Sequence, residues 1–357
     1  MSYDHSNANG NSSTKRPIPA KQVTLRDVAE AANVSTTAVS RVLHGGGASV
    51  RVSEERAAQI RAVAERLNYR VNAVARNLRT SRTHTIGVLF ENMHGLADGP
   101  LYTTHLLDGV ASVLFRKGYR LTLLAEIDHS DIIGSLGDGQ LEGVIWCKLA
   151  RDEDTVALIR KAPIPIVAFN AAAPELGTET VFVTCDNVGG LELAVDHLWK
   201  LGHRKIAFLF ESEEVNTPDC VDRREAYENA VEIRGGEIFS LECSWILWGL
   251  VEQLKDLHCT AVICWTESLA GRLLLKLQEA NIQVPEEISI IGFDSTQFCE
   301  TTTPRLTAIR QPIREMAAFA AQALLNLISG EKSDELSKVF PCSLDVRNST
   351  SERSSSH

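Results

Sequence analysis

The chain has 357 residues, 44% of them hydrophobic, and a formal net charge of -10. This length exceeds one ordinary core and predicts two or three domains. No apolar run approaches the ~18 residues of a membrane span, and residues 1–21 are polar without the apolar core of a secretory signal, so we expect a cytoplasmic protein and no membrane partner. The eight cysteines show no C-x-x-C pair and no histidine at metal-ligand spacing, which predicts reduced core thiols, no metal and no cofactor.

The charge is distributed unevenly along the chain. Residues 15–82 carry 13 Lys/Arg and five Asp/Glu, a net charge of +8, so the remaining residues carry -18. A basic segment is sometimes only a solvated face, but this asymmetry favours a module that binds a polyanion. The tails at 1–21 and 347–357 are rich in Ser and Asn, and we expect both to be disordered.

Three short helices are predicted within residues 22–70. Thr24, Ser35 and Ser53 each stand before a helical apolar pattern, where a hydroxyl can cap the first turn. The first two helices are joined by a tight turn at Asn33 and Val34, as in a helix-turn-helix. Short hydroxyls and one guanidinium remain on the outward face of the second helix, namely Ser35, Thr36, Thr37, Ser40 and Arg41. A plain three-helix bundle more often carries Glu, Lys or Gln there, so this face favours DNA recognition.

From residue 84 onward, β-rich apolar runs alternate with helical segments. The predicted strands are TIGVLF, YRLTLLAE, LEGVIWCK, PIVAFN, VFVTCD, KIAFLF, EIFSLE, AVICW and ISIIGFD. This alternation is typical of parallel α/β sheets, and its length favours two lobes. Ligands of such folds bind at the carboxyl ends of the strands.

Several long motifs together resemble the lactose-repressor (LacI/GalR) family of transcription factors. They are TLRDVAEAANVSTTAVSRVL, NYRVNAVARNLRT, HLWKLGHRKIAFL, VPEEISIIGFD and TAIRQPIREM, in the family's order and spacing. The resemblance implies a helix-turn-helix domain at 22–70, a hinge at 71–83 that includes a helix, and a two-lobed, periplasmic-binding-protein-like core at 84–346. Val71 departs from the family, which has a proline before Asn72.

The resemblance also assigns DNA contacts residue by residue. It implies that Thr36, Thr37 and Arg41 contact base edges in the major groove. The residues implied to face phosphates or the DNA backbone are Thr24, Ser35, Ser40, His44, Asn72 and Arg76. Leu78 corresponds to the leucine that wedges between base steps in the minor groove, although it could instead pack on the core.

For the core, the resemblance points to an effector site between the lobes. The residues it implies are Glu91, Asn92, Asn170, Arg223, Trp245, Thr266 and Asp294. Thr266 and Glu267 replace the family's usual Asn-Asp pair. A guanidinium that donates beside carboxylates that accept suits the adjacent hydroxyl groups of a vicinal diol, so a sugar or sugar derivative is favoured over a purine. A purine would need an aromatic stacking surface, and only Trp245 offers one. An Arg223–Asp294 salt bridge that latches the lobes without ligand is the simpler alternative.

We therefore expect an effector-responsive regulator, most simply a repressor of a carbohydrate-utilisation operon, that binds a palindromic operator as a homodimer or higher oligomer. The alternatives are a DNA-binding regulator whose interlobe site binds a nucleobase co-repressor, and one that responds to a protein partner rather than to a sugar. The chain lacks phosphate-loop, nucleophile-elbow and zinc-protease motifs, so we expect no enzyme activity.

Overall fold

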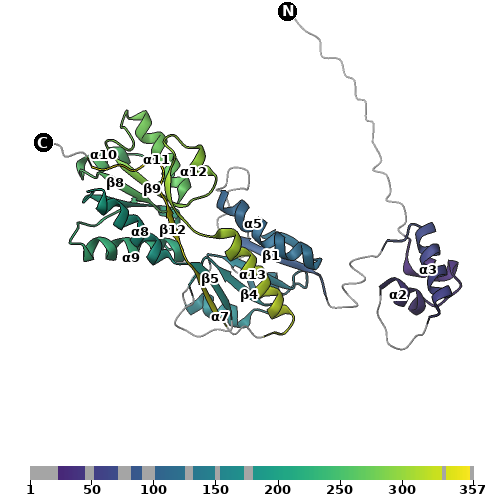
Figure 1. Cartoon of the computed structure of the whole chain (residues 1–357). Coiled ribbons are helices and arrows are strands. Elements are labelled where there is room, and N and C mark those ends of the chain that lie inside the picture. Colours follow the sequence, from purple (N-terminus) through teal and green to yellow (C-terminus); the bar gives the residue numbers. More distant parts are fainter. Residues whose placement is uncertain are drawn as a thin grey trace, which may run out of the picture. The chain divides into compact units, whose positions relative to one another are not determined.

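The computed structural model describes residues 23–44, 52–70, 82–90, 101–124, 132–148, 153–172, 180–331 and 335–353. The chain divides into two compact units, of which the first ends at Arg82 and the second begins at Thr83 (Figure 1). Among the described helices, none is both long and apolar enough to cross a membrane.

The first unit contains the three predicted helices, α1 (Leu25–Ala31), α2 (Thr36–His44) and α3 (Glu54–Arg66). The Thr24 hydroxyl accepts a hydrogen bond from the Asp27 amide, and the Asp27 carboxylate accepts one from the Thr24 amide, which closes a capping box on α1. Asn33 adopts a left-handed φ of 52° in the turn between α1 and α2. The core of this unit is small and is formed by Val28, Ala29, Ala32, Ala38, Val39, Ile60, Val63 and Ala64. Small alanines allow the helices to pack closely, so the predicted helix-turn-helix is confirmed.

The second unit contains two six-stranded sheets, one in each lobe. The first-lobe sheet has the order β11-β5-β4-β3-β1-β2, and its paired strands all run parallel. Its strands are β1 (Thr85–Phe90), β2 (Arg120–Leu124), β3 (Gly143–Cys147), β4 (Ile166–Phe169), β5 (Val181–Cys185) and β11 (Ser337–Phe340). The helices of this lobe are α5 (Leu101–Leu114), η1 (Phe115–Lys117), α6 (Ile132–Leu136), α7 (Glu153–Lys161) and α13 (Ile313–Ile328), of which α5 and α13 pack together.

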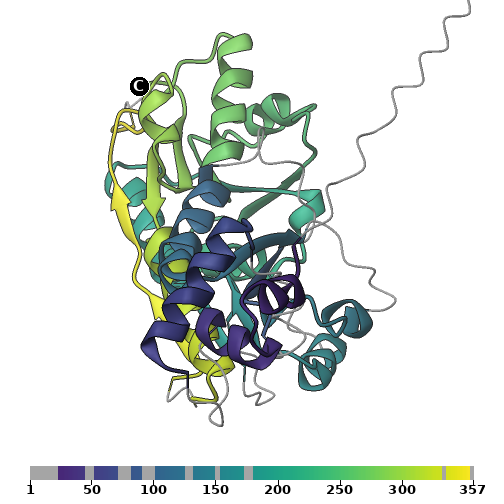
Figure 2. The ribbon, with the colours of Figure 1, turned by 90° about the vertical axis from the view of Figure 1, so that its right-hand side faces the viewer.

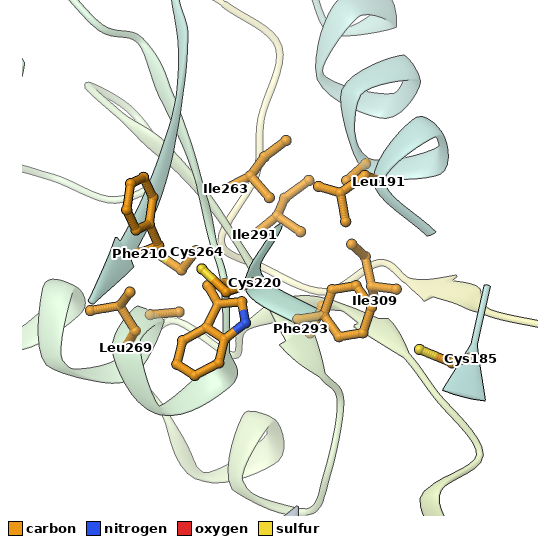
Figure 3. Packing of buried hydrophobic residues seen from close by; sticks show 14 of the residues in the cluster. Cys185, Leu191, Phe210, Cys220, Ile263, Cys264, Leu269, Ile291, Phe293 and Ile309 are labelled. Carbon is orange, nitrogen blue, oxygen red and sulfur yellow. The ribbon is translucent and has the colours of Figure 1, made fainter. Parts of the chain in front are cut away.

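The second-lobe sheet has the order β12-β10-β9-β8-β6-β7, with only β12 antiparallel to its neighbour β10 among the described pairings. Its strands are β6 (Ile206–Glu211), β7 (Phe239–Cys243), β8 (Ala261–Cys264), β9 (Ser289–Asp294), β10 (Thr307–Arg310) and β12 (Ser343–Asp345). The helices of this lobe are α8 (Asn187–Lys200), η2 (Ser212–Glu214), α9 (Pro218–Ile233), α10 (Leu250–Asp256), α11 (Glu267–Glu279) and α12 (Phe298–Thr301). Figure 3 shows Ile291 and Ile309 of two neighbouring strands close to Leu191 of α8, where the sheet packs on its helices.

The chain passes between the lobes three times, after β5, after β10 and after β11. Figure 2 shows the yellow C-terminal segment with β11 and β12 running along both lobes. Because the described parallel strands of each sheet point the same way, the residues that follow β3, β4, β6, β8 and β9 gather at the carboxyl ends of the two sheets.

The prediction of a disordered tail at 347–357 is wrong for residues 347–353. Ser349 is fully buried, and its hydroxyl donates to the Ile290 carbonyl at 2.6 Å. The Ser349 carbonyl accepts from the Ile290 amide at 2.8 Å, and the Arg353 amide donates to the Leu201 carbonyl at 2.9 Å. These hydrogen bonds compensate for the absence of apolar side chains, so a Ser-rich composition was a poor guide to order here. Residues 354–357 lie outside the described part of the chain.

Candidate DNA-contacting helix and interlobe site

The outward face of α2 carries the predicted DNA-contacting side chains. Ser35, Thr36 and Thr37 are exposed, whereas Ala38 and Val39 on the opposite face are buried in the three-helix core. The Ser35 hydroxyl caps α2 by accepting from the Ala38 amide at 3.2 Å. Short side chains at the start of an exposed helix allow close approach to base edges and phosphates.

Arg41 and Ser40 lie one turn further along α2 and are half-buried. His44 is the last residue of α2, and its side chain lies outside the described part of the structure, as do the hinge residues Asn72, Arg76 and Leu78. Their predicted DNA contacts stay predictions.

Arg223 is the most constrained residue of the predicted effector site. Its side chain is 1% exposed, and its guanidinium carbon lies 3.5 Å from the centre of the Phe293 ring. Nε donates to Asn187 Oδ1 at 2.9 Å and Nη1 donates to the Trp265 carbonyl at 2.8 Å, whereas Nη2 has no hydrogen-bond partner. Burial alone would lower the pKa of this guanidinium, but the carboxylates of Asp219 and Asp294 outweigh burial and raise it. The group is therefore a fixed cation with one donor nitrogen left to bind something else.

Asp294 is the last residue of β9 and is also buried, with 4% of its surface exposed. Its Oδ1 accepts from Gln311 Nε2 at 2.6 Å. Burial raises the pKa of the Asp294 carboxyl to about 7; the Arg223 cation opposes this rise, and the charge of Glu267 adds to it. Asp294 therefore changes charge near neutral pH.

Arg223 and Asp294 lie on the same lobe, so the predicted salt bridge between them cannot latch the lobes. The carboxylate within ion-pair distance of Arg223 is Asp219, one turn earlier on α9, at 3.9 Å. Asp219 Oδ2 accepts from the indole nitrogen of Trp265 at 3.2 Å, and Asp219 Oδ1 has no partner. Neither Asp219 nor Trp265 was predicted from the sequence.

An ion pair between the lobes is formed instead by Lys148, which follows β3 in the first lobe. Lys148 Nζ lies 2.7 Å from Glu214 Oε2 and 4.6 Å from the centre of the Trp265 ring, both in the second lobe. Burial would lower the pKa of Lys148, but Asp219 and Glu214 reverse the shift and raise it. Lys148 therefore joins the two lobes directly beside Asp219.

Asn170 and Tyr102 bring first-lobe groups to the same region. Asn170 follows β4, is 2% exposed and has a left-handed φ of 58°, and its Oδ1 is without a partner. The amide of Lys148 donates to the carbonyl of Phe169, which places Asn170 beside the lysine. Burial raises the pKa of Tyr102 on α5, and the charges of Cys147, Asp219 and Asp294 add to the rise.

The remaining predicted effector residues lie elsewhere or outside the described chain. Trp245 is 59% exposed and stacks on Arg272, whose guanidinium carbon lies 4.0 Å from its ring centre. No contact described for Trp245 reaches Asn170, Arg223 or Asp294. The Thr266 hydroxyl caps α11 by accepting from the Leu269 amide at 3.2 Å. Glu91 and Asn92 lie outside the described residues.

Comparison with known proteins agrees with this architecture. Residues 24–72 match the family model described as bacterial regulatory proteins, lacI family, and residues 195–350 match that of a periplasmic binding protein-like domain. The HTH-type transcriptional repressor PurR of Vibrio atlanticus (strain LGP32) is 32% identical over 333 residues, which cover 89% of this chain and 95% of the relative.

Two solved structures are also similar. A transcriptional regulator CelR–cellobiose complex has a TM-score of 0.66 at 26% identity and covers 92% of this chain and 100% of its own. A lac repressor dimer bound to operator and the anti-inducer ONPF has a TM-score of 0.80 at 23% identity, covering 93% of this chain and 100% of its own, which supports the fold. The basic helix-turn-helix unit, the two-lobed core and these similarities together show that the chain belongs to the lacI family of DNA-binding transcriptional regulators.

Proposed function

We propose that the chain is an effector-responsive repressor of carbohydrate-utilisation genes, that it binds a palindromic operator as a homodimer, and that it is not an enzyme. The effector we propose is a sugar or sugar derivative bound between the lobes. The 32% identical relative is named a repressor, and the similar CelR structure is a complex with cellobiose.

The observation that carries the sugar proposal is the arrangement of polar atoms around Arg223. The buried atoms without a hydrogen-bond partner include Asn170 Oδ1, Asp219 Oδ1, Arg223 Nη2 and Gln311 Oε1. An unpaired buried polar atom costs about 1–3 kcal/mol, so these atoms favour a ligand that pairs them. Three acceptors and one donor match adjacent hydroxyl groups, each of which can both donate and accept.

A nucleobase is the second candidate, because Tyr102 supplies an aromatic ring near Asp219 and Asp294. A base held by stacking also needs an aromatic surface opposite. Trp265 is covered by Lys148, and Trp245 stacks on Arg272. The aromatic groups therefore support a nucleobase less well than the carboxylates support a diol.

Exposed apolar side chains before α10 and on α11 support the homodimer. Ile246 is 69% exposed, Trp248 is 90% exposed and Leu275 is 61% exposed. Ile246 and Trp248 lie close together in the chain, and such clusters of exposed apolar side chains are typical of surfaces that bind another protein. Because one helix-turn-helix contacts one half-site, a two-fold dimer matches a palindromic operator.

Isothermal titration calorimetry with cellobiose, D-ribose, hypoxanthine and guanine tests the effector proposal. We expect heat from a sugar, lost in Arg223→Ala and kept in Arg224→Ala, because Arg224 is the next residue of α9 and lies 5.4 Å from the Phe210 ring. Binding of a purine with no response to either sugar would favour the nucleobase. Sugar binding of normal strength by Arg223→Ala would show that the site is elsewhere. Arg223→Lys, which keeps the charge without the fork, replaces Arg223→Ala if the latter does not fold.

A further inference from the structure

The turn that carries Asp294 has an unusual backbone. Asp294 has φ 93° and the next residue, Ser295, has φ 48°, so two consecutive non-glycine residues lie in the left-handed region. Such conformations are strained for residues with a side chain and persist only where surrounding contacts hold them. The turn therefore needs support from its neighbours.

Glu267, the first residue of α11, provides that support on one side. Its side chain is 1% exposed, and both of its carboxylate oxygens are used. Oε2 accepts from the Thr296 amide at 2.7 Å and from the Cys299 thiol at 3.1 Å, and Oε1 accepts from the Thr296 hydroxyl. One carboxylate thus holds the residue that directly follows the left-handed pair.

The other side of the turn is held by the C-terminal segment. The Ser295 hydroxyl donates to Asp345 Oδ2 at 2.6 Å and accepts from Arg347 Nη2 at 3.1 Å. The start of α11 also packs tightly on β9, because a Cβ on Gly292 would lie 3.1 Å from the Glu267 Cα. Glu267 has little freedom to move away from the turn.

We propose that Glu267 is a positioning residue of the interlobe site, which fixes the turn at 294–296 so that the Asp294 carboxylate faces Arg223 and the effector. This inference rests on the proposed function for the effector, whereas the geometry of the turn stands without it. Glu267 also acts through its charge, because it is a second carboxylate close to Asp294.

The charge state of Asp294 depends on groups from several elements. Those that face it are Arg223 and Asp219 on α9, Glu267 on α11, Tyr102 on α5, Cys185 at the end of β5 and Cys299 on α12. Burial is the largest cause of the raised pKa of Asp294, Arg223 lowers it, and Glu267 is the leading charge that raises it. Neutralising Glu267 should therefore lower the pKa of Asp294.

This charge coupling gives a measurement that needs no effector. An Asp whose pKa is raised in the folded protein binds a proton more tightly than in the unfolded chain, so stability falls as the pH rises towards the folded pKa. We expect the melting temperature of the wild type to fall between about pH 5 and about pH 8. Asp294→Asn should reduce this fall, and E267Q should reduce it as well. In the Asp294→Asn background, E267Q should not change the pH dependence further. Burial lowers the pKa of His197 and of His203, and because both histidines are present in every variant, their contribution cancels in this comparison.

Hydrogen exchange measures the positioning itself. E267Q cannot accept from both groups of Thr296, and E267D is too short to reach them, so both variants should lose amide protection in residues 295–299. E267D keeps the charge and should keep more of the wild-type pH dependence than E267Q. Glu279→Gln is the control, since Glu279 lies on the same helix with its side chain 68% exposed.

Two results would overturn the inference. One is an E267Q variant with wild-type protection and pH dependence, and the other is an equal effect of E267Q with and without Asp294. If E267Q does not fold, Thr296→Val removes the hydrogen bond from the Thr296 hydroxyl to Glu267 and is used for the hydrogen-exchange test instead. Failure of every sugar to bind would overturn the proposed effector while these outcomes still decide the role of Glu267.

Discussion

At the residue scale, Arg223 is a buried core residue, and in the proposed site its free Nη2 is also a donor to the ligand. Its guanidinium donates hydrogen bonds to Asn187 Oδ1 and to the Trp265 carbonyl, and it lies beside the buried carboxylate of Asp219. Removing one member of a buried ion pair typically costs about 3–5 kcal/mol, because the other charge remains buried and uncompensated. We predict that Arg223→Met lowers the free energy of unfolding by about this amount in urea denaturation. Adding Asp219→Asn should restore part of the loss, and an Arg223→Met variant as stable as the wild type would contradict the ion-pair account.

In the proposed site, Asp294 makes effector binding depend on pH. A ligand hydroxyl donates to the ionised carboxylate, so protonation of Asp294 competes with binding. With a pKa of about 7, the ionised fraction rises roughly tenfold between about pH 6 and about pH 8. We predict that the association constant for the sugar that binds rises by about the same factor, measured by calorimetry in matched buffers. In Asp294→Asn, the residual binding should not vary with pH over this range.

Arg41 is the long, forked donor of the α2 outward face. If it contacts a guanine edge with two hydrogen bonds, Arg41→Ala should weaken operator binding by about 1–3 kcal/mol and relax preference at one base position. Fluorescence anisotropy with operator and random duplexes measures both. An equal loss on the two duplexes would show that Arg41 contacts phosphate rather than a base.

At the element scale, the ends of β3, β6 and β8 are joined by Lys148. Its ion pair with Glu214 and its contact with the Trp265 ring are partly buried and connect the two lobes. We predict that Lys148→Met increases the radius of gyration of the effector-free protein in small-angle X-ray scattering, because the lobes lose this connection. Lys161→Met, at the exposed end of α7, is the matched control. An unchanged scattering profile for Lys148→Met would mean that other contacts hold the lobes.

The elements that the sequence predicted well are those with a strong local pattern. Each apolar run predicted as a strand is one, and the caps Thr24, Ser35 and Ser53 begin the helices that they were expected to begin. The strands β10, β11 and β12 were not predicted, because they have only three or four residues each and two of them are partly exposed edge strands. Their pairing depends on partners distant in the chain rather than on local periodicity.

For the candidate site, the sequence pointed to residues at the ends of strands. Asn170 directly follows β4 and Asp294 ends β9, whereas Arg223 came from the family resemblance, and the ligand contacts of all three stay predictions. Asp219 lies on a helix, and Trp265 looked like the last apolar residue of a strand, so neither carried a local signal. Lys148 was also missed, because only the packing of one lobe on the other gives its charge a role.

At the scale of the whole molecule, the proposed homodimer would join two half-site contacts. We predict that Trp248→Glu, which places a charge in the exposed apolar surface, shifts the protein to monomers in sedimentation velocity and weakens operator binding. The reason is that burying an unpaired charge opposes association. Ile233→Glu is the control, because Ile233 is 82% exposed at the end of α9, away from this surface in sequence. A dimeric Trp248→Glu variant would place the interface elsewhere.

The central claim is that a polyhydroxylated ligand between the lobes controls DNA binding. The direct measurement is operator affinity by fluorescence anisotropy, with and without cellobiose and D-ribose, for the wild type and Arg223→Ala, using an operator selected from random DNA. We predict that a sugar changes the operator affinity of the wild type by about 5- to 150-fold, the range of ordinary coupling energies, and leaves that of Arg223→Ala unchanged while the variant still binds DNA. An equal response of the two proteins, or a response of the wild type to purines and to no sugar, would contradict the claim.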